Sequence, residues 1–114
     1  MDMRPALVLA AAVAVAVLAT GCGGARHLGR PVATNEVLLP KSYKFEPAAI
    51  VIKAGTSVTW RNEDNFSHSV KVEHGPDHAL GRGKSVTIRF AQPGTYHYLC
   101  TLHSHDMRGE VVVQ

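Results

Sequence analysis

Residues 93–109 read PGTYHYLCTLHSHDMRG, and this stretch decides how the C-terminal part of the chain is organised. The Pro-Gly pair at its start fits a type II turn. Because side chains alternate along a strand, Tyr96, Tyr98 and Cys100 share one face of the strand predicted after that turn. The thiol therefore ends an apolar row, and the loop that follows carries imidazole and thioether groups before the next strand.

The donor groups of this loop indicate a metal site. Cys100 supplies a thiolate, His103 and His105 are alternative imidazole donors, and Met107 supplies a thioether. A soft sulfur beside imidazole suits copper, zinc or iron, whereas a weak Met sulfur added to Cys and His is typical of blue copper electron-transfer centres. The loop therefore predicts one copper ion, cycling between Cu(I) and Cu(II).

Such a centre needs a second histidine from another part of the chain. His68 is the best candidate, because alternation places it on the same face as Val70 and Val72 of a predicted strand. His74 and His78 flank a Pro-Asp turn and are expected at the surface.

The N-terminal residues have the composition of an export signal. Residues 1–21 contain Arg4, then an apolar run too short to span a membrane, and end in small residues. The segment Leu18-Ala19-Thr20-Gly21-Cys22 resembles a bacterial lipobox, which implies lipidation at Cys22. Residues 22–33 read as a flexible tether rich in Gly and Arg, which leaves residues 34–114 as the folded domain.

The remaining composition restricts the class of protein. The chain has 114 residues, a formal net charge of +3 and no basic run or aromatic platform that would indicate nucleic-acid binding. Short segments with strand-like alternation, separated by Gly, Pro and Asn turns, predict an all-β sandwich or barrel. The expected strands cover residues 36–39, 49–53, 57–61, 68–73, 84–90, 95–100 and 108–113.

Several motifs in order resemble the cupredoxins of the plastocyanin and amicyanin type. They are YKFEP at 43–47, VTWRN at 58–62, HSV at 68–70, PGTYHYLCTLH at 93–103 and MRG at 107–109. The resemblance implies a Greek-key β-sandwich of about seven to eight strands. It also implies copper bound by His68, Cys100 and His103, with Met107 as the axial ligand. The chain departs from these families in its Cys-x2-His-x3-Met loop and in Ser69, where they usually carry an Asn that braces the Cys loop.

These expectations describe an electron carrier and not an enzyme. It would be a monomer anchored through Cys22 to the extracytoplasmic face of a bacterial membrane, periplasmic or at the cell surface, where it meets redox partner proteins. Leu102 beside His103 would offer a small apolar docking face. Copper delivery with the same ligands is the alternative function. A structural zinc site is possible from the donors but fits the cupredoxin resemblance less well. A Cys-His hydrolase fits least, because no third orienting group or oxyanion device is evident.

Overall fold

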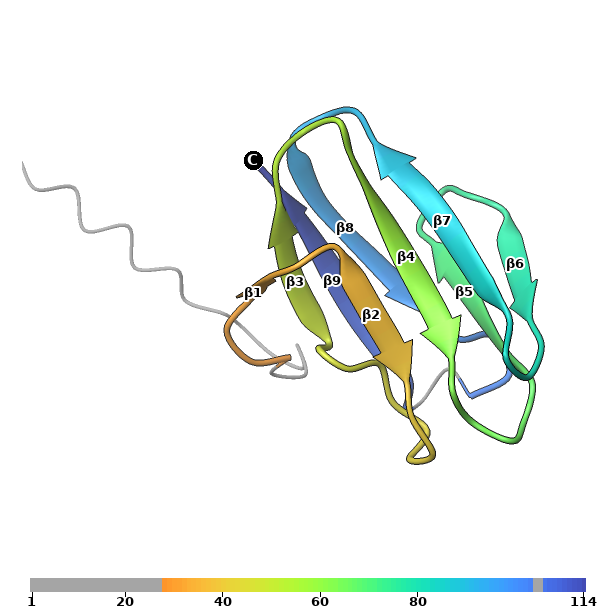
Figure 1. Ribbon diagram of the computed structural model, residues 1–114. Coiled ribbons are helices and arrows are strands. Elements are labelled where there is room, and N and C mark those ends of the chain that lie inside the picture. The colour runs from red at the N-terminus through yellow and green to blue at the C-terminus, as the bar shows by residue number, and fades with distance from the viewer. Residues whose placement is uncertain (1–27, 104–105) are drawn as a thin grey trace, which may run out of the picture.

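The computed structural model describes residues 28–103 and 106–114 of the chain (Figure 1). Within these residues it contains nine β-strands in two sheets and no α-helix, which confirms the all-β sandwich. None of the described segments is a helix long and apolar enough to cross a membrane. The predicted signal segment, Cys22 and His105 lie outside the described residues.

The two sheets differ in size and lie face to face (Figure 1). The larger sheet contains, in spatial order, β1 (Val32–Ala33), β3 (Ala49–Ile52), β9 (Arg108–Val113), β8 (Gly94–Leu99), β5 (His68–Val72) and β6 (Asp77–Leu80). The smaller sheet contains β2 (Glu36–Leu39), β4 (Thr56–Asn62) and β7 (Ser85–Phe90). Because β2, β3 and β4 alternate between the sheets, the chain crosses from one to the other, as in a Greek-key sandwich.

All seven expected strands are present, each within one residue of its expected ends. Two further strands carry little sequence signal. The two-residue β1 is formed by parallel pairing with β3 at the end of the segment expected to be a tether. Strand β6 begins at Asp77, within a segment that reads as a turn, and it exists because it pairs with β5.

The core lies between the two sheets and follows the predicted alternation. Val58 and Trp60 on β4 are fully buried. Ser57, which precedes them, and Thr59, which lies between them, are only partly buried. Edge-to-face contacts join Trp60 to Tyr98 of the larger sheet, with ring centroids 5.2 Å apart. The apolar side chains of β7 are less well covered than expected, with only Phe90 buried, because β7 is an edge strand.

The topology brings the predicted ligands to one end of the sandwich. Strands β5 and β8 pair in antiparallel fashion, with Lys71 opposite Leu99, so the start of β5 lies near the end of β8. Strand β9 also begins there, because Arg108 pairs with Leu99. His68 opens β5, and residues 100–107 connect β8 to β9 at the same end.

Candidate metal centre

His68 and Cys100 form a buried pair at the end of the core. The Nδ1 atom of His68 lies 3.9 Å from the Sγ atom of Cys100. His68 is 1% exposed and Cys100 is fully buried. An imidazole nitrogen and a thiol facing each other in an apolar setting can both turn their lone pairs toward one ion, provided that Nδ1 carries no hydrogen.

Asp64 determines which nitrogen of His68 carries the hydrogen. Its Oδ2 atom lies 2.8 Å from Nε2 of His68, and both side chains are buried. The hydrogen bond with His68 holds the pKa of Asp64 below its usual value, so the carboxylate is ionised and acts only as an acceptor. Nε2 is therefore the donor, and in the neutral imidazole Nδ1 keeps its lone pair on the side of Cys100.

Asn62 organises the loop that presents Asp64. Its side-chain amide donates to the carbonyl oxygens of Phe66 and Leu80, at 2.8 and 2.9 Å. Its Oδ1 atom accepts a hydrogen bond from the backbone N–H of Asp64 at 2.9 Å. With every polar atom of this buried amide in use, the loop between β4 and β5 has a fixed shape that holds Asp64 against His68.

His103 lies beside this pair, in the turn that follows Cys100. Its backbone N–H donates to the Cys100 carbonyl at 3.3 Å, and its ring centroid is 5.3 Å from that of His68. The Tyr43 ring packs edge-on against His103 at 4.9 Å. Tyr43 adopts a positive φ of 52°, which is uncommon for a bulky side chain.

Met107 closes the loop and is fully buried just before β9. Its carbonyl accepts the Cys100 N–H at 3.1 Å, and its own N–H donates to the His103 carbonyl at 2.9 Å. Two backbone hydrogen bonds therefore fix the backbone of Met107 relative to Cys100 and His103.

The described residues do not form a complete site from acidic, thiol and imidazole groups alone. No three His, Cys, Asp or Glu side chains in residues 28–103 and 106–114 are arranged so that they could hold a metal ion. The structure brings together His68 and Cys100, with His103 next to the His68 ring.

Ser69 stands where plastocyanins and amicyanins usually carry an Asn, and it contacts the Cys100 loop through other atoms. Its backbone N–H donates to Cys100 Sγ at 3.4 Å, and its Oγ atom accepts the N–H of Thr101 at 2.8 Å. The hydroxyl thus braces the residue after the Cys. Asp64, Tyr43 and Thr101 were not assigned roles from the sequence, although an acidic residue four positions before His68 could have pointed to Asp64.

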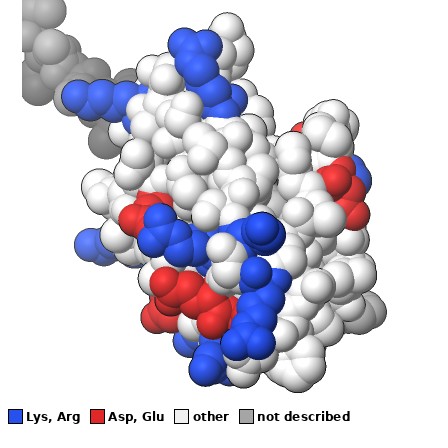
Figure 2. All heavy atoms as spheres, turned by 45° about the vertical axis from the view of Figure 1, so that its right-hand side comes forward, with Lys and Arg blue, Asp and Glu red and all other residues white. Residues whose placement is uncertain are grey.

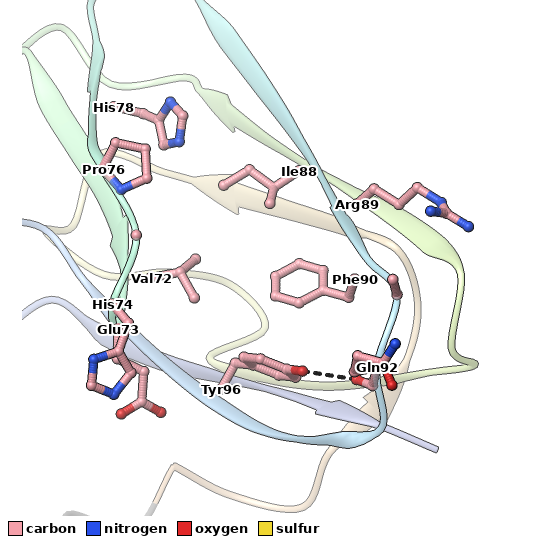
Figure 3. Close-up of a pocket in the computed structure, with 12 residues that line it drawn as sticks. Val72, Glu73, His74, Pro76, His78, Ile88, Arg89, Phe90, Gln92 and Tyr96 are labelled. Atoms are coloured by element: carbon pink, nitrogen blue, oxygen red, sulfur yellow. Dashed lines mark hydrogen bonds between the residues drawn. The ribbon is translucent and has the colours of Figure 1, made fainter.

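Two other described histidines, His74 and His78, line a separate pocket. This pocket has a volume of about 270 Å³ and lies between the edges of the two sheets (Figure 3). Val72, Phe90 and Tyr96 also line it, and the Tyr96 hydroxyl donates to the Gln92 carbonyl at 2.9 Å. None of the four predicted ligands lines this pocket, so it is separate from the candidate centre.

The fold and the donors define a class of small β-sandwich proteins with Cys, His and Met side chains gathered at one end. Within that class the chain belongs to the cupredoxin family, because the model for the cupredoxin-like domain matches residues 9–113.

Individual relatives agree with this assignment. The chain is 37% identical to amicyanin-alpha of Methylorubrum extorquens, over 96% of this chain and 95% of the relative. Its fold is similar to the Cu(I) form of an amicyanin variant, with 30% identity and a TM-score of 0.62 over 73% of this chain and 86% of the other. It is also similar to a purple cupredoxin from Nitrosopumilus maritimus, with a TM-score of 0.66 over 71% of this chain and all of the other, at 23% identity.

Proposed function

We propose that the protein is a mononuclear copper protein that carries single electrons. His68, Cys100 and His103 would hold the ion, and Met107 would be a weak axial ligand. The observation that carries this proposal is the buried pair of His68 Nδ1 and Cys100 Sγ, 3.9 Å apart. Membership of the cupredoxin family and the similarity to the Cu(I) form of an amicyanin variant support copper as the metal.

The protein's own groups supply rigidity and exclude water. Bound copper would supply the one-electron change between Cu(I) and Cu(II). Asp64 keeps the His68 ring oriented, and the strands fix the positions of His68 and Cys100, so little rearrangement would accompany a change of charge. The fully buried Cys100 and Met107 sulfurs are shielded from solvent.

Electrons would enter and leave near His103, where apolar side chains reach the surface. Leu102 is 60% exposed and Phe66 is 58% exposed. Tyr43, which contacts His103, also stacks against Phe66 with ring centroids 6.0 Å apart. We call Tyr43, Phe66 and Leu102 the apolar rim. A small apolar surface of this kind suits brief encounters with redox partner proteins.

The alternative is copper delivery with the same ligands. The burial of Cys100 and His68 favours retention of the ion over its exchange. One experiment distinguishes the two functions. The protein is loaded with one equivalent of copper, oxidised and reduced repeatedly in the presence of a chelator, and its retained copper is measured. An electron carrier keeps its copper through many cycles. Loss of the ion to the chelator on reduction would favour delivery and contradict the proposal.

We further propose that the protein is exported and anchored through a lipid on Cys22, on the extracytoplasmic face of a bacterial membrane. The motivation is the apolar segment of residues 1–21, which ends directly before Cys22. Replacing Cys22 with Ser should move the protein from the membrane fraction to the soluble exported fraction. A wild-type protein that is already found in the soluble fraction would contradict the anchor.

A further inference from the structure

A chain of hydrogen bonds joins the Cys100 sulfur to a carboxylate on strand β6. Ser69 contacts Cys100, the Ser69 and Thr101 hydroxyl oxygens lie 2.8 Å apart, and the Thr101 hydroxyl donates to Asp77 Oδ2 at 2.8 Å. We propose that Asp77 is a positioning residue that sets the reduction potential by turning the Ser69 hydroxyl away from the Cys100 sulfur. This inference rests on the proposed function.

The direction of each hydrogen follows from counting donors. A Ser or Thr hydroxyl has one hydrogen to donate, and an ionised carboxylate has none. Because Thr101 donates its hydrogen to Asp77, its oxygen can only accept from Ser69. The Ser69 oxygen already accepts the Thr101 backbone N–H at 2.8 Å. The single Ser69 hydroxyl hydrogen is therefore directed to Thr101.

The competing acceptor for that hydrogen is the Cys100 sulfur. The Ser69 oxygen lies 3.8 Å from Sγ, which is longer than the 3.4 Å of the backbone N–H contact from the same residue. While Asp77 orients the two hydroxyls, the sulfur receives its hydrogen bond from the Ser69 backbone. Without Asp77, Thr101 can donate to Ser69, and the Ser69 hydroxyl becomes free to donate to Cys100.

Strand pairing explains why Asp77 can perform this role although it is exposed. Asp77 lies opposite Lys71 in the β5–β6 ladder, and Ala79 lies opposite Ser69. Asp77 and Ser69 are therefore held on neighbouring strands, and Thr101 reaches both. Ser69 is itself 3% exposed, so water does not readily replace its partners.

A second hydrogen bond to the Cys100 sulfur would change the reduction potential of the copper centre. A donor withdraws electron density from the thiolate, and the oxidised state depends more on that density than the reduced state does. Freeing the Ser69 hydroxyl should therefore raise the potential. Removing the negative charge of Asp77 would also raise it, so the experiment has to separate charge from hydrogen-bond direction.

The experiment compares Asp77→Ala with Asp77→Asn, each with Ser69 and with Ser69→Ala, in the copper-loaded protein. Asn removes the charge but keeps an oxygen that accepts from Thr101. We expect Asp77→Ala to have a more positive potential than Asp77→Asn and a shifted thiolate-to-copper absorption band. The difference should disappear with Ser69→Ala, which has no hydroxyl to redirect. Equal potentials for the two variants, or a difference that persists with Ser69→Ala, would overturn the inference.

The metal-free protein gives an independent measurement. A neutron structure should show the Ser69 hydroxyl hydrogen in contact with the Thr101 hydroxyl oxygen in the wild type and in Asp77→Asn. In Asp77→Ala that hydrogen should point to Cys100 Sγ instead, so the contact is lost. If the wild type lacks this contact, the inference is wrong. If the contact is present but the protein takes up no copper, the proposed function fails while the direction of the hydrogen bonds stands.

Discussion

Met107 and Cys100 are both buried sulfur residues, but we assign them different roles. A thioether is a weak donor that stabilises the oxidised ion more than the reduced one. Met107→Leu should therefore keep the strong visible band and raise the reduction potential. Because the exchange roughly conserves volume, we expect a loss of less than about 1.5 kcal/mol in unfolding free energy. An unchanged potential, measured by redox titration, would remove Met107 from the ligand set.

Gly109 permits a close approach between two strands. A Cβ atom there would collide with the Tyr98 ring and would lie 2.7 Å from the Ala48 carbonyl oxygen, which accepts a hydrogen bond from the Tyr98 hydroxyl. Burial also raises the pKa of Tyr98, so this hydroxyl stays protonated. The space beside Gly109 is therefore fully used.

We expect Gly109→Ala to lower the free energy of unfolding by about 1–3 kcal/mol, because overpacking displaces Tyr98 from the core. Denaturant titration measures the effect. Gly81→Ala is the matched control, since the added Cβ would meet only Lys84 Cγ at an ordinary 3.7 Å. Equal stabilities for the two variants would show that Tyr98 can move at little cost.

At the scale of elements, the loop between β4 and β5 supports the candidate centre. Asp64→Ala would leave Nε2 of His68 buried without its acceptor, whereas Asp64→Asn keeps an oxygen in the same place. We expect Asp64→Ala to weaken copper binding by roughly 10–100-fold, as is typical when a partner of a ligand histidine is removed. Chelator competition measures this, and the loss in Asp64→Asn should be smaller. Equal affinity in Asp64→Ala and the wild type would contradict the orienting role.

The sequence predicts the elements better than it predicts their contacts. Alternation locates seven of the nine described strands, because burial of one face imposes a period of two on the side chains. Strand β6 escapes this signal, since its Asp77 and His78 resemble the preceding turn and its strand state depends on pairing with β5. The side chains that form hydrogen bonds around the predicted ligands also cannot be found from alternation. Asp77 and Ser69 become neighbours only through strand register, which alternation does not specify.

At the scale of the whole molecule, the face drawn in Figure 2 carries charges of both signs. Figure 2 shows Lys and Arg interleaved with Asp and Glu on the face in view, and Arg61 and Glu36 form an exposed ion pair at 3.3 Å. The displayed face carries no large area of a single sign. We expect partner recognition to depend on the apolar rim beside His103.

Leu102→Glu tests whether partners meet this rim. The substitution should slow electron exchange with a redox partner and leave the visible spectrum nearly unchanged, because Leu102 lies outside the proposed ligand set. Val32→Glu is the matched control, since it adds the same charge to an exposed apolar residue on β1, at the opposite edge of the larger sheet from β6. Stopped-flow rates that fall equally in both variants, or in neither, would exclude the rim as the docking surface.

The central claim is that Cys100 binds copper as a thiolate in an electron-transfer centre. Its most direct test is the visible absorption spectrum of the Cu(II)-loaded protein beside that of Cys100→Ser, each with its copper content measured. We predict an intense thiolate-to-copper band in the wild type and its loss in Cys100→Ser, even if the histidines of the variant still hold an ion. A wild-type protein that binds one copper and stays colourless, or a band that survives in Cys100→Ser, would contradict the account.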